Sequence, residues 1–142
     1  MTRKHKTSRP KAADSEYSKA NRAWLADKAK EDGVIALPEG VYYRVITEGG
    51  SGKSPTPSNV VSFYYRGRTI DDKVFDTNLG SHPMACRLRD LIEGWIIAMQ
   101  HMHVGDKWEL FIPAELGYGY DPLPDIPAGS TLIFEVELLG IA

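Results

Sequence analysis

The chain has 142 residues, of which 42% are hydrophobic and 25% charged, and its formal net charge is −2. This composition is typical of one globular domain with short appendages, and it gives no whole-chain case for binding nucleic acid or a membrane surface. No apolar run approaches the roughly 20 residues of a transmembrane helix, and the only cysteine, Cys86, excludes a disulfide within the chain.

The chain opens with a basic segment. Residues 1–13 are basic and polar with no apolar period, which predicts a disordered tail. No apolar stretch follows the basic residues, so the pattern of a signal peptide is missing. We therefore expect a cytoplasmic protein, or a periplasmic one if the printed sequence lacks a leader.

A helical extension is expected over residues 14–33. Asp14 or Ser15 can cap its first turn, and a narrow apolar stripe includes Tyr17 and Trp24. Such a stripe must be covered. The following domain is the first choice and a second copy of the chain is the alternative, so we expect a monomer or a weak homodimer through this helix.

Alternating and β-branched patterns predict strands along the rest of the chain. The expected strands cover residues 41–47, 60–66, 74–76, 84–88, 107–112 and 131–139. Residues 114–130 precede the last strand as a long irregular loop, and such loops are often functional. Together with one inserted helix, this order predicts an α+β fold in which an antiparallel sheet curls over a helix.

The inserted helix is expected over residues 90–99. Asp90 can cap its first turn, and Gly94 suggests that a neighbouring group approaches the backbone closely, because glycine destabilises a helix. Its apolar stripe consists of Leu91, Ile92, Trp95, Ile96 and Met99. Periodicity alone favours an ordinary core helix with Trp95 as a packing residue.

Covalent and metal chemistry find little support in the sequence. No Ser, Thr or Cys lies in a recognisable nucleophile signature, and Cys86 reads as a buried thiol in a strand. His101 and His103 alternate in a link, without a cysteine or carboxylate to complete a metal site. We therefore expect no metal and no cofactor, and a site made mainly of aromatic side chains.

In order along residues 60–142, the motifs resemble those of the FKBP-type peptidyl-prolyl isomerases. They are Tyr65-Arg66-Gly67, Lys73-Val74-Phe75-Asp76, Leu91-Ile92-Glu93-Gly94-Trp95, Ile112-Pro113-Ala114-Glu115-Leu116-Gly117-Tyr118-Gly119, Ile126-Pro127-Ala128-Gly129-Ser130-Thr131-Leu132 and Phe134-Glu135-Val136-Glu137-Leu138-Leu139. The preceding helix and Leu37-Pro38-Glu39-Gly40-Val41 resemble the bacterial branch that contains the macrophage infectivity potentiator proteins. The resemblance implies that residues 34–142 form the isomerase domain.

The family further implies a half-barrel of about five strands wrapped on one short helix, with a pocket between them. Trp95 would form the floor of the pocket and Asp76 the one carboxylate at its rim. The implied substrate-binding residues are Phe75, Leu91, Ile92, Trp95, Tyr118, Ile126 and Phe134. The implied catalytic residues are Tyr65, Asp76, Ile92 and Tyr118, with the Ile92 N–H and the Tyr118 hydroxyl as donors to the bound peptide's carbonyls. Asp76 either orients Tyr65 or polarises the site, or it accepts hydrogen bonds that hold the loop after Phe75; we expect a mixture of these roles, with modest catalytic weight.

The implied activity is acceleration of rotation about X-Pro bonds in folding proteins. Proline-containing polypeptides are then the expected partners, and macrolides are candidate inhibitors. A binding module or chaperone of the same fold with little turnover is the alternative. Cys86 stands where the family often has Phe, and Met84 lies nearby; both departures keep that alternative open.

Overall fold

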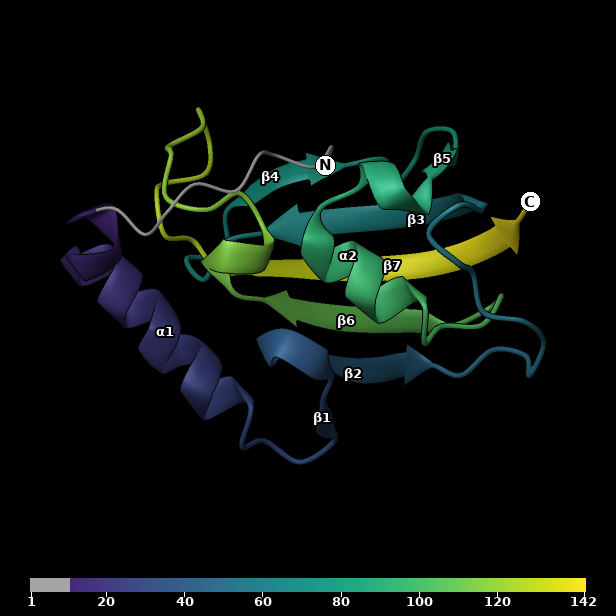
Figure 1. The fold of residues 1–142 in the computed structure, drawn as a ribbon, viewed down its shortest axis with the longest axis horizontal. Helices are drawn as coiled ribbons and strands as arrows, with labels where there is room; N and C mark the ends of the chain where they lie inside the picture. Colours follow the sequence, from purple (N-terminus) through teal and green to yellow (C-terminus); the bar gives the residue numbers. More distant parts are fainter. Residues whose placement is uncertain (1–10) are drawn as a thin grey trace.

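The computed structural model of the protein describes residues 11–142, where seven strands form one antiparallel sheet with a helix on each face (Figure 1). The strands are β1 (Val34–Ala36), β2 (Tyr42–Thr47), β3 (Val60–Arg68), β4 (Val74–Thr77), β5 (Met84–Arg87), β6 (Lys107–Ile112) and β7 (Leu132–Ile141). The helices are α1 (Glu16–Lys28) and α2 (Glu93–Met99), and short 3-10 turns are η1 (Lys11–Asp14), η2 (Pro38–Gly40), η3 (Leu88–Asp90) and η4 (Ala114–Leu116). The predicted α+β class is confirmed.

Strand order in the sheet is β1-β2-β6-β7-β3-β4, and β5 also pairs with β3. The last strand of the chain, β7, therefore lies between β6 and β3 in the middle of the sheet. β1 was not among the predicted strands, and it brings the sheet beyond the expected five or so. Its three residues are too short to establish an alternating pattern.

One face of the sheet holds the main apolar core. Burial alternates along β3, so that Val61, Phe63 and Tyr65 point inward, as the period of two predicted. Phe134 on β7 joins the same apolar cluster, and Trp95 of α2 packs against this face without any solvent exposure. In Figure 1, α2 lies across the middle strands.

The inserted helix is shorter than predicted. α2 begins at Glu93, because Asp90 belongs to the preceding turn η3 and does not cap it. The residue before α2 is Ile92, whose backbone is extended and whose side chain makes no cap hydrogen bond. The expected close approach at Gly94 is confirmed, since a Cβ there would lie 2.5 Å from Cγ2 of Ile112.

The N-terminal helix packs on one end of the other face of the sheet (Figure 1). Ser15 caps α1, with its Oγ accepting a hydrogen bond from the Ser18 N–H at 3.0 Å. Leu25 packs against Phe111 and Ile133, which alternate with the core residues of β6 and β7. The helix thus docks on its own chain, the first of the two predicted arrangements.

The predicted tail of residues 1–13 lies largely outside the described part of the chain. Its first ten positions are not among the described residues, and residues 11–13 belong to η1. Ala13 in this turn is buried.

Candidate active site

Aromatic rings from β3 and β7 pack around the indole of Trp95. The Trp95 ring lies 4.9 Å from Phe63, 5.2 Å from Phe134 and 5.8 Å from Tyr65 between centroids, at angles between 63° and 83°. Phe75 of β4 extends the cluster, 5.5 Å from Phe134 at 88°. Such edge-to-face contacts are favourable and fix ring orientation, so the cluster is a rigid apolar wall.

Every residue predicted for the site belongs to the main apolar core, packs against it or, in the case of Asp76, hydrogen-bonds to one of its members. Tyr65, Phe75, Trp95 and Phe134 are in ring contact, and Leu91, Ile92, Tyr118 and Ile126 belong to the same buried apolar core. Phe63 contacts Trp95 but was not predicted for the site. Its position two residues before Tyr65 on β3 was the available signal, because residues i and i+2 of a strand share a face.

The carboxylate of Asp76 accepts a hydrogen bond from the Tyr65 hydroxyl at 2.8 Å. Burial, and then this bond to Asp76, raise the pKa of Tyr65. The loop after Phe75 is held by other groups: Thr77 Oγ1 donates to the Tyr65 carbonyl at 2.9 Å, and Asn78 Oδ1 accepts from the Tyr65 N–H at 2.8 Å. The geometry therefore favours the interpretation in which Asp76 orients Tyr65.

Tyr118 offers a protonated hydroxyl beside the rings. Burial, followed by the negative charge of Asp76, raises the pKa of Tyr118 to about 12. Within residues 11–142 the hydroxyl makes no hydrogen bond, so it remains a free donor there. Gly117 and Gly119 set this loop: a Cβ on Gly117 would lie 2.6 Å from Leu132 Cδ1, and Gly119 has a φ of +70°.

The pKa of Tyr118 predicts how stability depends on pH. Its hydroxyl keeps its proton up to about pH 12 in the folded chain but only to about pH 10 when unfolded. The resulting stability is complete below pH 10 and is lost as the pH rises toward 12, by up to about 1.4 kcal/mol per pH unit. Urea unfolding from about pH 8 to about pH 11.5 should therefore show a shallower fall for Tyr118→Phe. Parallel curves would contradict the assigned pKa.

One backbone N–H and one side-chain N–H near the rings have no hydrogen-bond partner within residues 11–142. The Ile92 carbonyl accepts from the N–H groups of Trp95 and Ile96, whereas the Ile92 N–H meets no acceptor there. Nε1 of Trp95 is buried and likewise unpaired within the described chain. Buried donors are nearly always paired, so these groups are candidates for contacts with a ligand.

The strand β5 carries Cys86 and Met84 alongside β3, the strand of Phe63 and Tyr65. Cys86 pairs with Val61 and Met84 with Phe63 across β3. Cys86 is partly buried, which raises its pKa, and it contributes to the raised pKa of Tyr65. Met84 is 39% exposed.

Within residues 11–142, no helix combines the length and apolar content that a membrane crossing requires. In the same part of the chain, no three side chains of His, Cys, Asp or Glu are grouped in a way that could hold a metal ion.

Comparison with known proteins gives matches over most of the chain. Residues 51–139 match the family model of the FKBP-type peptidyl-prolyl cis-trans isomerases, and residues 1–45 match the domain amino-terminal to such isomerases. The FKBP-type 22 kDa peptidyl-prolyl cis-trans isomerase of Escherichia coli is 42% identical over 120 residues, which cover 83% of this chain and 58% of the relative. The outer membrane protein MIP of Legionella longbeachae is 35% identical over 133 residues, which cover 92% of this chain and 56% of the relative.

By these coverages, the chain spans about half the length of the curated relatives it matches. A crystal structure of a peptidyl-prolyl cis-trans isomerase from Pseudomonas syringae pv. tomato is similar over nearly its whole length. It has a TM-score of 0.84 and 34% identity, covering 96% of this chain and 98% of that one. From the matched motifs, relatives and fold, we conclude that the chain belongs to the FKBP-type peptidyl-prolyl cis-trans isomerase family, in the branch that includes the macrophage infectivity potentiator proteins.

Proposed function

We propose that the chain is a peptidyl-prolyl cis-trans isomerase that accelerates rotation about X-Pro bonds in folding polypeptides. The observation that carries this proposal is a pair of donors, the Ile92 N–H and the Tyr118 hydroxyl, that have no acceptor among residues 11–142 and belong to the same apolar core as the indole of Trp95. Membership of a family named for this reaction supports it.

The reaction requires no bond to be broken. Amide resonance sets a barrier of about 18–20 kcal/mol, and uncatalysed X-Pro rotation takes on the order of tens to hundreds of seconds. The planar amide has greater charge separation than the twisted one, so an apolar wall stabilises the planar form less than water does. Donors directed at the carbonyl of the twisted amide would bind that state better than the planar one, which lowers the barrier.

Each predicted site residue has a role in this scheme. Trp95 supports the proline ring while the preceding carbonyl rotates. The ring's other contacts are proposed as Phe75, Leu91, Ile92, Tyr118, Ile126 and Phe134. The Ile92 N–H and the Tyr118 hydroxyl donate to carbonyl oxygens of the peptide. Tyr65, oriented by Asp76, completes the polar rim and carries a modest share of the catalysis.

A protease-free isomerisation assay on a set of X-Pro peptides tests the proposal. The wild type should accelerate rotation, and Tyr118→Phe should lower kcat/KM about tenfold, because one donor to the twisted state is lost. Tyr43→Phe is the matched control. The Tyr43 ring stacks on Trp108 with 3.9 Å between ring centroids and has no ring contact with the site cluster, so this variant should leave kcat/KM unchanged.

If Tyr118→Phe and the wild type have equal kcat/KM, the Tyr118 hydroxyl does not act as a donor in catalysis. A wild type that binds X-Pro peptides or a macrolide without accelerating rotation would instead establish the alternative, a binding module or chaperone with little turnover. The partial exposure of Met84 and Cys86 beside the site is the feature that favours this alternative.

Further assignments belong to the same proposal. We propose residues 34–142 as the isomerase domain, residues 14–33 as its helical extension, and proline-containing polypeptides as partners, with macrolides as inhibitors and no cofactor. A cytoplasmic location is our prediction, with the periplasm as the alternative, since one relative is named an outer membrane protein. The docked α1 favours a monomer over a weak homodimer, which light scattering would decide.

A further inference from the structure

The loop between η4 and β7, residues 117–131, is held by the N-terminal helix. This loop carries Tyr118 and Ile126, whose side chains join the buried core around Trp95. Within it, a single isolated bridge joins Leu123 to Ile126, and most of residues 121–125 are exposed. Backbone hydrogen bonds join Gly119 to Gly129 and Leu123 to Ile126 within the loop, and the N-terminal segment adds contacts from outside it. Figure 1 places the loop beside the start of α1.

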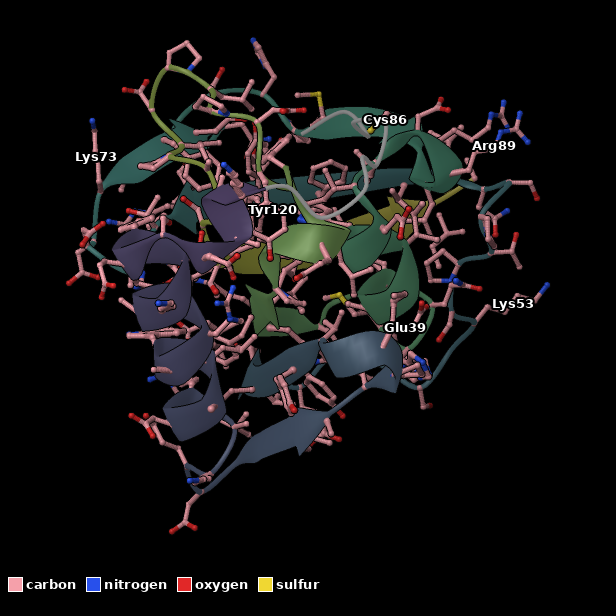
Figure 2. All side chains as sticks on the ribbon, turned by 60° about the vertical axis from the view of Figure 1, so that its left-hand side comes forward. Glu39, Lys53, Lys73, Cys86, Arg89 and Tyr120 are labelled. Atoms are coloured by element: carbon pink, nitrogen blue, oxygen red, sulfur yellow. The ribbon has the colours of Figure 1, made fainter. Side chains whose placement is uncertain are left out.

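The first contact between the N-terminal segment and the loop region is apolar. Ala13 of η1 packs against Ala114 and Tyr120, and the Tyr120 hydroxyl donates to Glu115 at 2.5 Å. Figure 2 shows Tyr120 next to the first turns of the N-terminal helix.

The second contact is a close approach of backbone to helix. Gly129 has a φ of +81°, and a Cβ at this position would overlap Oγ of Ser18. The Gly129 N–H donates to the Gly119 carbonyl at 3.0 Å, which links this contact to the residue after Tyr118. Ser18 is itself fixed, because its hydroxyl donates to the Ala12 carbonyl at 2.6 Å.

The third contact is a buried hydrogen-bond pair. Asn21 is 1% exposed, and its Oδ1 accepts from the Thr131 N–H at 2.7 Å, across 110 residues of sequence. Its Nδ2 donates to the Tyr17 carbonyl at 2.8 Å, which fixes the amide so that the oxygen faces Thr131. The Thr131 hydroxyl donates back to the Asn21 carbonyl at 3.3 Å.

A buried N–H left without an acceptor is costly, so this pair permits essentially one position of the loop end relative to α1. Thr131 directly precedes β7, which carries Phe134. The helix itself adds no side chain to the apolar core around Trp95. The helix reaches the site through this loop, and also through the Tyr17 hydroxyl, which donates to Asp71 at 2.9 Å in the turn before β4.

We infer that Asn21 is a positioning residue for the isomerisation. Acting with Ser18, it holds the loop so that Tyr118 and Ile126 lie against the ring cluster. The inference rests on the proposed function, and it makes turnover and peptide preference depend on a helix that lies outside the site.

The test compares Asn21→Leu with Leu25→Ala. Both variants weaken the docking of α1, but Leu25 packs on Phe111 and Ile133, away from the loop. Asn21→Leu should lower kcat/KM about tenfold, mainly through kcat, and should change the order of rates among X-Pro peptides, because small errors in position strongly slow catalysis. Leu25→Ala, assayed where both variants are folded, should keep the wild-type kcat/KM and rate order.

Amide hydrogen exchange supplies a readout that is independent of turnover. Residues 117–130 should exchange faster in Asn21→Leu than in Leu25→Ala. If Asn21→Leu does not fold, Asn21→Ser, whose side chain is too short to reach Thr131, replaces it in the same comparison.

The outcomes separate the inference from the proposed function. A wild type without turnover refutes the proposed function, and hydrogen exchange alone then decides whether Asn21 positions the loop. Equal exchange of residues 117–130 in the two variants overturns the inference. So does an equal fall of kcat/KM in Asn21→Leu and Leu25→Ala, because that pattern reflects general loss of stability.

Discussion

Replacing Trp95 by alanine is expected to lower the free energy of unfolding by about 3–5 kcal/mol and kcat/KM by about a hundredfold. The indole is wholly buried, and Phe63, Tyr65 and Phe134 all have ring centroids within 5.8 Å of it. Its removal leaves a cavity, and the proline ring loses its support. Urea unfolding gives the stability, and the peptide assay under folding conditions gives kcat/KM.

Trp108→Ala is the matched control for this variant. Trp108 is 5% exposed and stacks on Tyr43, outside the ring cluster of the site. It should cost a comparable amount of stability while kcat/KM stays within about twofold of wild type. Trp95→Leu, which leaves a smaller cavity, serves if the alanine variant does not fold. A folded Trp95 variant with wild-type kcat/KM would exclude the indole from the site.

Substituting Gly67 by alanine is expected to disturb the site from the opposite side. A Cβ on Gly67 would lie 2.5 Å from Cε1 of Phe134 and 2.7 Å from Cζ of Phe75, so both rings must move. We expect a loss of about 1–3 kcal/mol in the free energy of unfolding and a fall in kcat/KM of about tenfold or more. Thermal or urea unfolding together with the peptide assay measures both effects.

Gly140→Ala provides the control for Gly67→Ala. Gly140 also lies in a strand, β7, but a Cβ there would meet no atom within 4 Å. Its kcat/KM should match the wild type, and its stability should change little. If Gly67→Ala and Gly140→Ala behave alike, the rings of Phe75 and Phe134 do not need the space beside Gly67.

Local patterns predicted the elements whose burial is periodic. The alternation of β3 and β7 predicted which of their residues share a face, and Ser15, one of two predicted capping candidates with Asp14, begins α1. The start of α2 could not be predicted in this way. Ile92 precedes α2 with an extended backbone and no side-chain cap, so it carries no capping signal, whereas Asp90 carried a misleading one.

Contacts between segments far apart in the chain could not be predicted from local sequence patterns. The family motifs placed Tyr65, Phe75, Trp95 and Phe134 in one site, and the structure brings their rings together. Asn21, in contrast, is a polar residue within a helix, which normally indicates a solvated face. Its burial depends on the loop end at Thr131, and no pattern within the helix records that partner.

The central place of β7 has a consequence for biosynthesis. Because this strand supplies the hydrogen-bond partners of both β3 and β6, the sheet cannot be completed while its residues are still inside the ribosome. A nascent chain lacking β7 presents two unpaired strand edges, which are prone to aggregation. The protein that is proposed to assist the folding of others can therefore complete its own sheet only once β7 has left the ribosome.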